Sequence, residues 1–141
     1  MDKKIVIRAM DSNDYEKVMN LWSTTEGIGL SDADTKANIE MFLNRNSGLS
    51  CVAELGEHIV GAVLCGHDGR RGYFHHLAVN TVYRGRGIAR QLIGYCLSRL
   101  KEQGISKCHL FVFTNHQRGI AFWSHMGFYK RTDLNVFSKD I

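Results

Sequence analysis

The stretch Val82-Tyr83-Arg84-Gly85-Arg86-Gly87-Ile88-Ala89-Arg90 is the most informative segment of this 141-residue chain. It lies between an apolar run and a segment with a helical repeat, which predicts a turn from a strand into a helix. Glycines let backbone N–H groups converge, and a helix N-terminus adds partial positive charge. The three arginines have the unfavourable sign for that helix dipole, at about 0.3–1 kcal/mol each. A bound diphosphate would satisfy both the arginines and the open N–H groups, so the turn predicts an anion site.

Other interpretations of this turn compete with the anion site. A solvated basic turn on the surface is equally consistent with the pattern. A P-loop needs Gly-Lys followed by Ser or Thr, and Arg90 does not supply it. The dinucleotide-binding fingerprint needs a small residue where Arg90 stands, and no acidic residue ends a following strand at the right distance.

Length and composition predict one globular domain over residues 1–141. Hydrophobic residues make up 44% and charged residues 23%, which excludes disordered and fibrous classes. No apolar run approaches the roughly 20 residues that span a bilayer, and no secretory signal is expected. Four cysteines without Cys-x-x-Cys spacing favour a cytoplasmic protein over a disulfide scaffold. The net charge of +4 suggests an anionic ligand and does not require nucleic acid.

The order of predicted elements is β-α-α-β-β-β-α-β-α-β. This order predicts an α/β fold with a mixed, mostly antiparallel sheet and helices on both faces. The run at 109–113 is too apolar for an exposed strand and is predicted to be central. Ser31-x-x-Asp34 resembles a capping box that starts the second helix. The expected strands are 5–9, 51–54, 59–65, 73–79 and 109–113, with 128–131 and 134–137 together closing the chain as the last strand, and the expected helices begin near residues 11, 31, 87 and 115.

Two motifs resemble the GCN5-related N-acetyltransferase (GNAT) family. The segment 84–89, Arg-Gly-Arg-Gly-Ile-Ala, resembles the acetyl-CoA signature Gln/Arg-x-x-Gly-x-Gly/Ala. The segment 119–128, Gly-Ile-Ala-Phe-Trp-Ser-His-Met-Gly-Phe, is similar to the family's last helix and its Gly-Phe exit. Leu77-Ala78-Val79-Asn80 also resembles the strand that leads into the signature. The predicted order of elements matches the family's fold over essentially the whole chain.

The resemblance implies a binding mode for acetyl-CoA. Backbone N–H groups of residues 84–89 would hold the pyrophosphate, and Arg84, Arg86 and Arg90 would assist. The strand that ends at Leu77-Ala78-Val79 would splay from the strand around residues 111–113 and offer an open edge to the pantetheine arm. The Ala78 and Val79 amides would polarise the thioester carbonyl. The cofactor-binding residues are thus expected to include Leu77, Ala78, Val79, Arg84, Gly85, Arg86, Gly87, Ile88, Ala89 and Arg90.

Family members transfer acetyl directly to an amine in a ternary complex, and the attacking amine must be neutral. At pH 7 a lysine amine is neutral in roughly one molecule in a few thousand, and an α-amine in roughly one in ten. His75 and His76 are candidate bases, and strand alternation predicts that only one of them faces the cleft. Some family members carry a histidine two residues before the Leu-Ala-Val element, which favours His75. The alternative is that His75 packs without titrating usefully.

Two glutamates are second choices for the catalytic base. Glu26 lies in the loop where the family usually recognises its acceptor, and Glu54 is on a strand beside the sheet centre. Each is otherwise a solvated carboxylate, which is the common state of a glutamate. Together with Asp32 and Asp34, Glu26 suggests a cationic acceptor.

The last helix departs from the family pattern at two positions. Trp123 stands where a tyrosine usually protonates the leaving thiolate, and an indole N–H donates but is not a usable acid. Trp123 is instead expected to bind the cofactor, by packing against or hydrogen-bonding the thioester sulfur at the end of the pantetheine arm. Water can suffice, because a thiolate of pKa near 8.5 is a tolerable leaving group. The family's asparagine corresponds to His116, with Asn115 adjacent, and either is expected to contact the pantetheine arm. Asn115 is alternatively the helix N-cap.

The leading hypothesis is an acetyl-CoA-dependent N-acetyltransferase whose acceptor is a small-molecule amine or the N-terminus or a lysine of a protein. A second hypothesis is a non-catalytic domain that senses CoA or acyl-CoA. A nucleic-acid-binding protein would need one basic stripe, whereas acids are interspersed among the basic residues here. The histidines and cysteines show no metal-ligand spacing, so no metal is expected. No membrane partner is expected, and a homodimer is an assembly that is frequent in the family.

Overall fold

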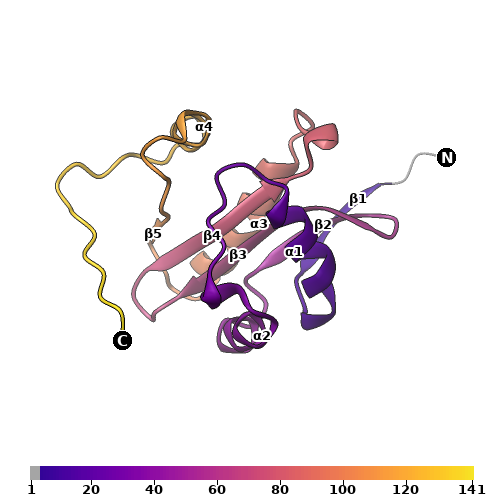
Figure 1. The fold of residues 1–141 in the computed structure, drawn as a ribbon, viewed down its shortest axis with the longest axis horizontal. Helices are drawn as coiled ribbons and strands as arrows, with labels where there is room; N and C mark the ends of the chain where they lie inside the picture. The colour runs from indigo at the N-terminus through magenta and orange to yellow at the C-terminus, as the bar shows by residue number, and fades with distance from the viewer. Residues whose placement is uncertain (1–3) are drawn as a thin grey trace. The chain divides into compact units, whose positions relative to one another are not determined.

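A five-stranded sheet is the centre of the computed structural model, which describes residues 4–141 (Figure 1). The chain divides after Phe111 into two units, residues 4–111 and 112–141, which are described separately. The sheet belongs to the first unit. Its first three pairings are antiparallel, and the last is parallel. Its strands, in spatial order, are β1 (Ile5–Ala9), β2 (Cys51–Leu55), β3 (His58–His67), β4 (Gly72–Val79) and β5 (Cys108–His109).

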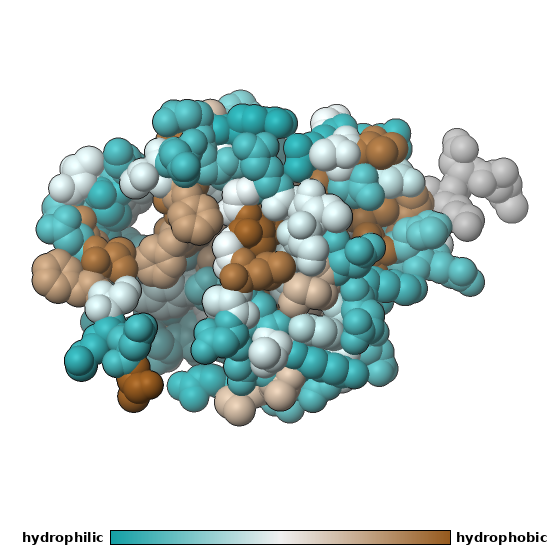
Figure 2. All heavy atoms as spheres, in the orientation of Figure 1, coloured by the Kyte–Doolittle hydropathy of each residue, from teal (hydrophilic) through white to brown (hydrophobic). Residues whose placement is uncertain are grey.

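Three helices cover the two faces of the sheet (Figure 1). On one face, α1 (Tyr15–Ser23) and α2 (Lys36–Arg45) bury Trp22 and Ile39 in a core with β2, β3 and β4. On the other face lies α3 (Ile88–Glu102). A Cβ placed on Gly61 of β3 would come within 3.0 Å of the Leu92 side chain of α3, so this contact requires glycine. The outward surface of α2 is mostly polar (Figure 2).

The caps that the sequence predicts at the starts of the first two helices instead cap short 3-10 turns, and α2 itself begins at a separate cap, Thr35. Asp11 caps the 3-10 turn η1 (Ser12–Asp14), and Asp14 returns a bond to the Asp11 backbone. Ser31 and Asp34 form the predicted capping box around η2 (Asp32–Asp34). These reciprocal bonds satisfy N–H groups that a helix start leaves open. A third turn, η3 (Thr81–Tyr83), precedes α3.

A β-bulge interrupts β4. Ala62 pairs with Ala78 and Leu64 with His75, so two steps along β3 oppose three along β4. His76, within the bulge, has φ of +57°, in the left-handed region that only glycine and a few polar residues visit routinely. A bulge bends its strand and breaks the alternation of side chains between faces.

The prediction of a central strand at 109–113 is wrong. β5 covers only Cys108–His109, lies at the sheet edge and pairs with β4 only at Gly72 and Tyr73. Phe111 is 64% exposed. Because β4 bends at its bulge, the parallel ladder ends before the apolar run begins, and hydrophobicity alone did not indicate burial here.

The predicted strands at 128–131 and 134–137 are not formed either. In residues 112–141 the regular element is α4 (Gln117–His125). A strand needs a neighbouring backbone for its ladder, and this unit offers none within itself. Arg131 instead pairs with Asp133 at 3.0 Å across a bend. The α/β architecture and the remaining element order agree with the prediction, and no helix in residues 4–141 is long and apolar enough to cross a bilayer.

Candidate functional site

The turn between β4 and α3 is built by local hydrogen bonds. The Asn80 side chain accepts from the Val82 N–H at 3.0 Å and starts η3. Arg84 follows η3, and its Nε donates to the Val79 carbonyl at 3.2 Å. This bond ties Arg84 to the end of β4, and the residue as a whole remains exposed.

Two glycines open the backbone at the start of α3. Gly85 has φ of +79° and Gly87 has φ of +78°, a conformation that favours glycine. A Cβ on either would meet no atom within 4 Å, so the space above them is open. Gly87 is the N-cap of α3 and supplies no side-chain cap. The first N–H groups of α3, from Ile88 and Ala89, are therefore available to an anionic ligand.

Three exposed arginines surround these N–H groups: Arg84, Arg86 and Arg90. The Arg86 guanidinium lies 5.2 Å from the centre of the Tyr83 ring, a cation–π contact that orients it. Guanidinium groups bind phosphate oxygens in pairs. The structure thus brings the predicted cations and open amides to one end of α3.

The C-terminal half of β4 has one open backbone edge beside this turn. Ala78 and Val79 are buried and pair with β3 on one side. On the other side the ladder to β5 ends at Tyr73–His109, so residues 75–79 have no partner strand there among residues 4–141. An extended amide chain can add to such an edge.

Both histidines of β4 lie on the face covered by α1 and α2. The His75 ring packs edge-on against Phe42 of α2, and the His76 ring packs against Trp22 of α1 with centroids 5.1 Å apart. The two imidazole centroids are 6.5 Å apart. The prediction that only one of them faces this side is wrong, because the bulge at His76 removes the alternation on which it depended.

His75 is held as a neutral imidazole. Burial lowers its pKa below the usual 6.5, and the neighbouring charge of His76 lowers it further, while Asp34 acts in the opposite direction. A lowered pKa leaves the ring unprotonated at neutral pH and able to accept a proton.

Acid should destabilise the protein through His75. Its pKa is lower in the folded chain, so the unfolded chain binds more protons below pH 6.5, and the free energy of unfolding should fall as pH drops. Replacing His75→Gln should make this fall shallower between pH 7 and pH 5. Urea unfolding at several pH values measures it, and parallel curves for both proteins would contradict the assignment.

The two candidate glutamates have different surroundings. Glu54 accepts from Arg8 at 2.8 Å, and Arg8 also forms two 2.8 Å bonds to Asp14 on the other side. Glu54 therefore belongs to an ion-pair network between β1 and β2. Glu26 is exposed in the loop after α1.

The residues expected from the last helix belong to the second unit. His116 is the N-cap of α4 and makes no side-chain cap bond, so the alternative interpretation of Asn115 as the N-cap is wrong. Trp123 packs against Phe122 and Phe128, with ring centroids about 5 Å apart. Within its own unit, Trp123 therefore contributes to aromatic packing.

The sequence did not point to Asp34 as a partner of His76. The Asp34 Oδ1 lies 2.9 Å from the His76 Nε2, and Oδ2 accepts from the Ser31 N–H at 3.0 Å. The capping box explained Asp34 by a local hydrogen bond, so there was no reason to expect its contact with His76 from the sequence. No sequence signal joins the two residues, because the contact spans 42 positions.

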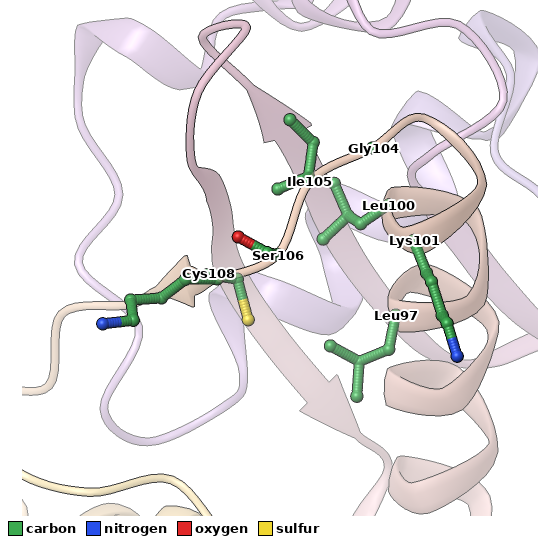
Figure 3. Close-up of a pocket in the computed structure, with 8 residues that line it drawn as sticks. Leu97, Leu100, Lys101, Gly104, Ile105, Ser106 and Cys108 are labelled. Atoms are coloured by element: carbon green, nitrogen blue, oxygen red, sulfur yellow. The ribbon is translucent and has the colours of Figure 1, made fainter.

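A hollow of about 530 Å³ lies elsewhere, between the end of α3 and the start of β5 (Figure 3). Leu97 and Leu100 extend into it from α3. It contains none of the predicted site residues. Its lining residues are Leu97, Leu100, Lys101, Gly104, Ile105, Ser106, Lys107 and Cys108.

Comparison with known proteins settles the family. The sequence model of the acetyltransferase (GNAT) family matches residues 15–128. The chain belongs to the GNAT acetyltransferase family. It is 34% identical to an acetyltransferase of Pectobacterium atrosepticum over 133 residues, which cover 94% of this chain and 93% of that protein. The chain is therefore an acetyltransferase.

Solved structures share the fold at lower identity. An aminoglycoside N-acetyltransferase, AAC(6')-Iy, in complex with CoA superposes with a TM-score of 0.80 at 18% identity, covering 100% of this chain and 98% of that one. A chain of the NatC complex bound to Gag peptide and CoA superposes with a TM-score of 0.75 at 22% identity, covering 92% and 87%. At these identities the likeness shows the fold.

Proposed function

We propose that this acetyltransferase moves an acetyl group from acetyl-CoA to a primary amine by direct attack in a ternary complex, with residues 1–141 acting as one catalytic domain. The observation that carries the proposal is the turn from Arg84 to Arg90, whose open amides and arginines adjoin the open edge of β4. The diphosphate binds at the turn, and the pantetheine arm extends along Leu77, Ala78 and Val79. Asn115, His116 and Trp123 stay predicted contacts of that arm.

The chemistry needs one proton acceptor on the protein. The amine nitrogen attacks the thioester carbonyl carbon, the C–S bond breaks, and the sulfur leaves as a thiolate with the bond's electron pair. Before the attack, an imidazole of β4, His75 or His76, takes one proton from the ammonium form of the amine; after the attack, water takes the second proton that the nitrogen loses as the amide forms. Water protonates the thiolate, because Trp123 carries no usable acid. Glu54 is bound to Arg8 and is not included as a base.

A cationic amine is the acceptor class that the α1–α2 segment favours. Glu26 and Asp32 are exposed there, whereas Asp34 is buried and bonded to His76. The fold neighbours named above include an aminoglycoside N-acetyltransferase and a complex with a bound peptide, so both small amines and peptide N-termini belong in a test panel.

The test follows free thiol as the protein turns over acetyl-CoA with spermidine, kanamycin and an unblocked tripeptide. Thiol release that requires an amine, with a matching acetylated product by mass spectrometry, supports the proposal. Arg84→Ala should raise the KM for acetyl-CoA about tenfold, since it removes a charged hydrogen bond of roughly 1.5 kcal/mol. Binding of acetyl-CoA without any amine-dependent thiol release would contradict the proposal.

A further inference from the structure

The geometry points to His76 rather than His75 as the imidazole that takes the proton from the amine, with Asp34 as its positioning residue. This inference rests on the proposed function and deepens it. Its central observation is the 2.9 Å contact between the His76 Nε2 and the Asp34 Oδ1.

The contact fixes which ring nitrogen of His76 is basic. A carboxylate only accepts hydrogen bonds, so Nε2 carries a proton and donates it to Asp34. Nδ1 then presents its lone pair, and it has no hydrogen-bond partner among residues 4–141. This is the tautomer that a general base requires, and a buried acid holds the ring in it, as in Asp–His pairs of hydrolytic enzymes.

Hydrogen bonds hold both carboxylate oxygens and the backbone carbonyl of Asp34. Its side chain is 6% exposed, and Oδ2 accepts from the Ser31 N–H at 3.0 Å. The Tyr15 hydroxyl donates to the Asp34 carbonyl at 2.8 Å. The carboxylate therefore cannot rotate away from His76 without losing a capping bond. Being fully paired, it is also not available to bind the acceptor's ammonium group.

The electrostatic surroundings favour His76 over His75 as a base. Facing His76 are Trp22 from α1, Asp34 from η2 and His75 from β4. Asp34 accepts the Nε2–H of His76 and can keep this hydrogen bond when Nδ1 takes a proton. His75 has no hydrogen-bonded carboxylate among the described residues, and burial disfavours its charged form.

The backbone at His76 is strained, and the strain lies next to the proposed thioester site. A left-handed φ costs about 1–2 kcal/mol for a residue with a Cβ. Such strain persists where surrounding contacts hold it, often at functional sites. The Asp34 bond and the Trp22 contact hold His76, and the next residues, Leu77 and Ala78, carry the open edge. The proposed proton acceptor, His76, is therefore adjacent in β4 to the residues where the thioester carbonyl would bind.

The first experiment compares two matched variants, His76→Gln and His75→Gln, with the amine probe of the panel that gives the highest wild-type rate. Gln keeps a donor near the Nε2 position of His76 and removes the basic nitrogen. His76→Gln should lower kcat/KM for the amine about 100- to 1000-fold at pH 7, a loss at least about tenfold larger than that of His75→Gln. The His76→Gln deficit should shrink as pH approaches the amine's own pKa, because the amine is then already neutral. The reverse order of the two variants would overturn the inference and leave the proposed function intact.

A second arm needs no acceptor substrate. Nitrogen-15 NMR of the imidazoles should show His76 protonated at Nε2 and unprotonated at Nδ1 at pH 8. In Asp34→Asn this preference should weaken, kcat should drop about 10-fold or more while the KM for acetyl-CoA holds, and Asp34→Glu should restore part of kcat. Calorimetry with CoA should give wild-type affinity for all variants, which separates this result from a failed CoA site. A His76 ring protonated at Nδ1 would overturn the inference by itself.

Discussion

Replacing Gly87→Leu should weaken the binding of coenzyme A at least about 100-fold. Gly87 has φ of +78° and open space where a Cβ would lie, directly before the free N–H groups of α3. A leucine side chain would occupy the space through which phosphate oxygens approach those groups. Losing two charge-assisted hydrogen bonds at roughly 1.5 kcal/mol each accounts for a 100-fold change.

Gly104→Leu is the matched control for this substitution. Gly104 follows the other end of α3, has φ of +81° and likewise has no atom within 4 Å of the place that a Cβ would take. Both substitutions should therefore cost similar stability, about 1–2 kcal/mol, from the left-handed backbone. Isothermal titration with CoA should show a binding loss only in Gly87→Leu, and urea unfolding should show equal destabilisation. Equal CoA affinity in the two variants would remove residues 85–89 from the binding site.

Elements with a clear period were predictable from the sequence. The stripe Ile88, Leu92 and Leu100 marks α3, and the two apolar runs of the β2–β3 hairpin are separated by a glycine turn. Segments that lack a neighbour were not predictable. The segment 134–137 has the composition of a strand, but composition records only compatibility with a sheet and not the presence of a ladder partner. The prediction at Phe111 failed for the same reason, because the sheet ends at His109.

The turn that we propose as the phosphate site could be predicted because its requirements are local. Positive φ, open amides and nearby cations all follow from a few adjacent residues, Arg84 to Arg90. The proposed base, His76, could not be identified from the sequence because its role depends on contacts with distant residues. Sequence alternation separates His75 from His76, and nothing in the sequence predicts a bulge at His76 or its contact with Asp34.

Replacing Arg8→Met should lower the free energy of unfolding by about 2–3 kcal/mol. Removing one partner of a fully buried ion pair costs about 3–5 kcal/mol. The loss expected here is smaller because Arg8 is partly exposed. Arg8 donates two 2.8 Å bonds to Asp14, whose side chain is 9% exposed, and another 2.8 Å bond to Glu54. Burial opposes ionisation of Asp14, yet its hydrogen bonds with Arg8 and the Asp11 backbone outweigh burial and lower its pKa. Methionine would leave Asp14 charged, buried and without its cation.

The pH dependence of Arg8→Met identifies the mechanism. Because the folded pKa of Asp14 is lowered, its contribution to wild-type stability is present above the unfolded pKa near 3.8 and is lost as pH falls. In the variant the hydrogen bonds and charge of Arg8 are gone, and burial is opposed only by the Asp11 backbone bond and the charge of Lys17. The pKa of Asp14 should therefore be higher than in the wild type, so protonation of Asp14 should reduce the destabilisation of the variant as acid is added. The stability gap should therefore narrow between pH 7 and pH 4 in urea unfolding. Arg131→Met is the control, since its bidentate pair with Asp133 is exposed and its loss should change neither stability nor pH dependence. A gap that stays constant with pH would mean that lost packing, not the charge of Asp14, sets the cost of removing Arg8.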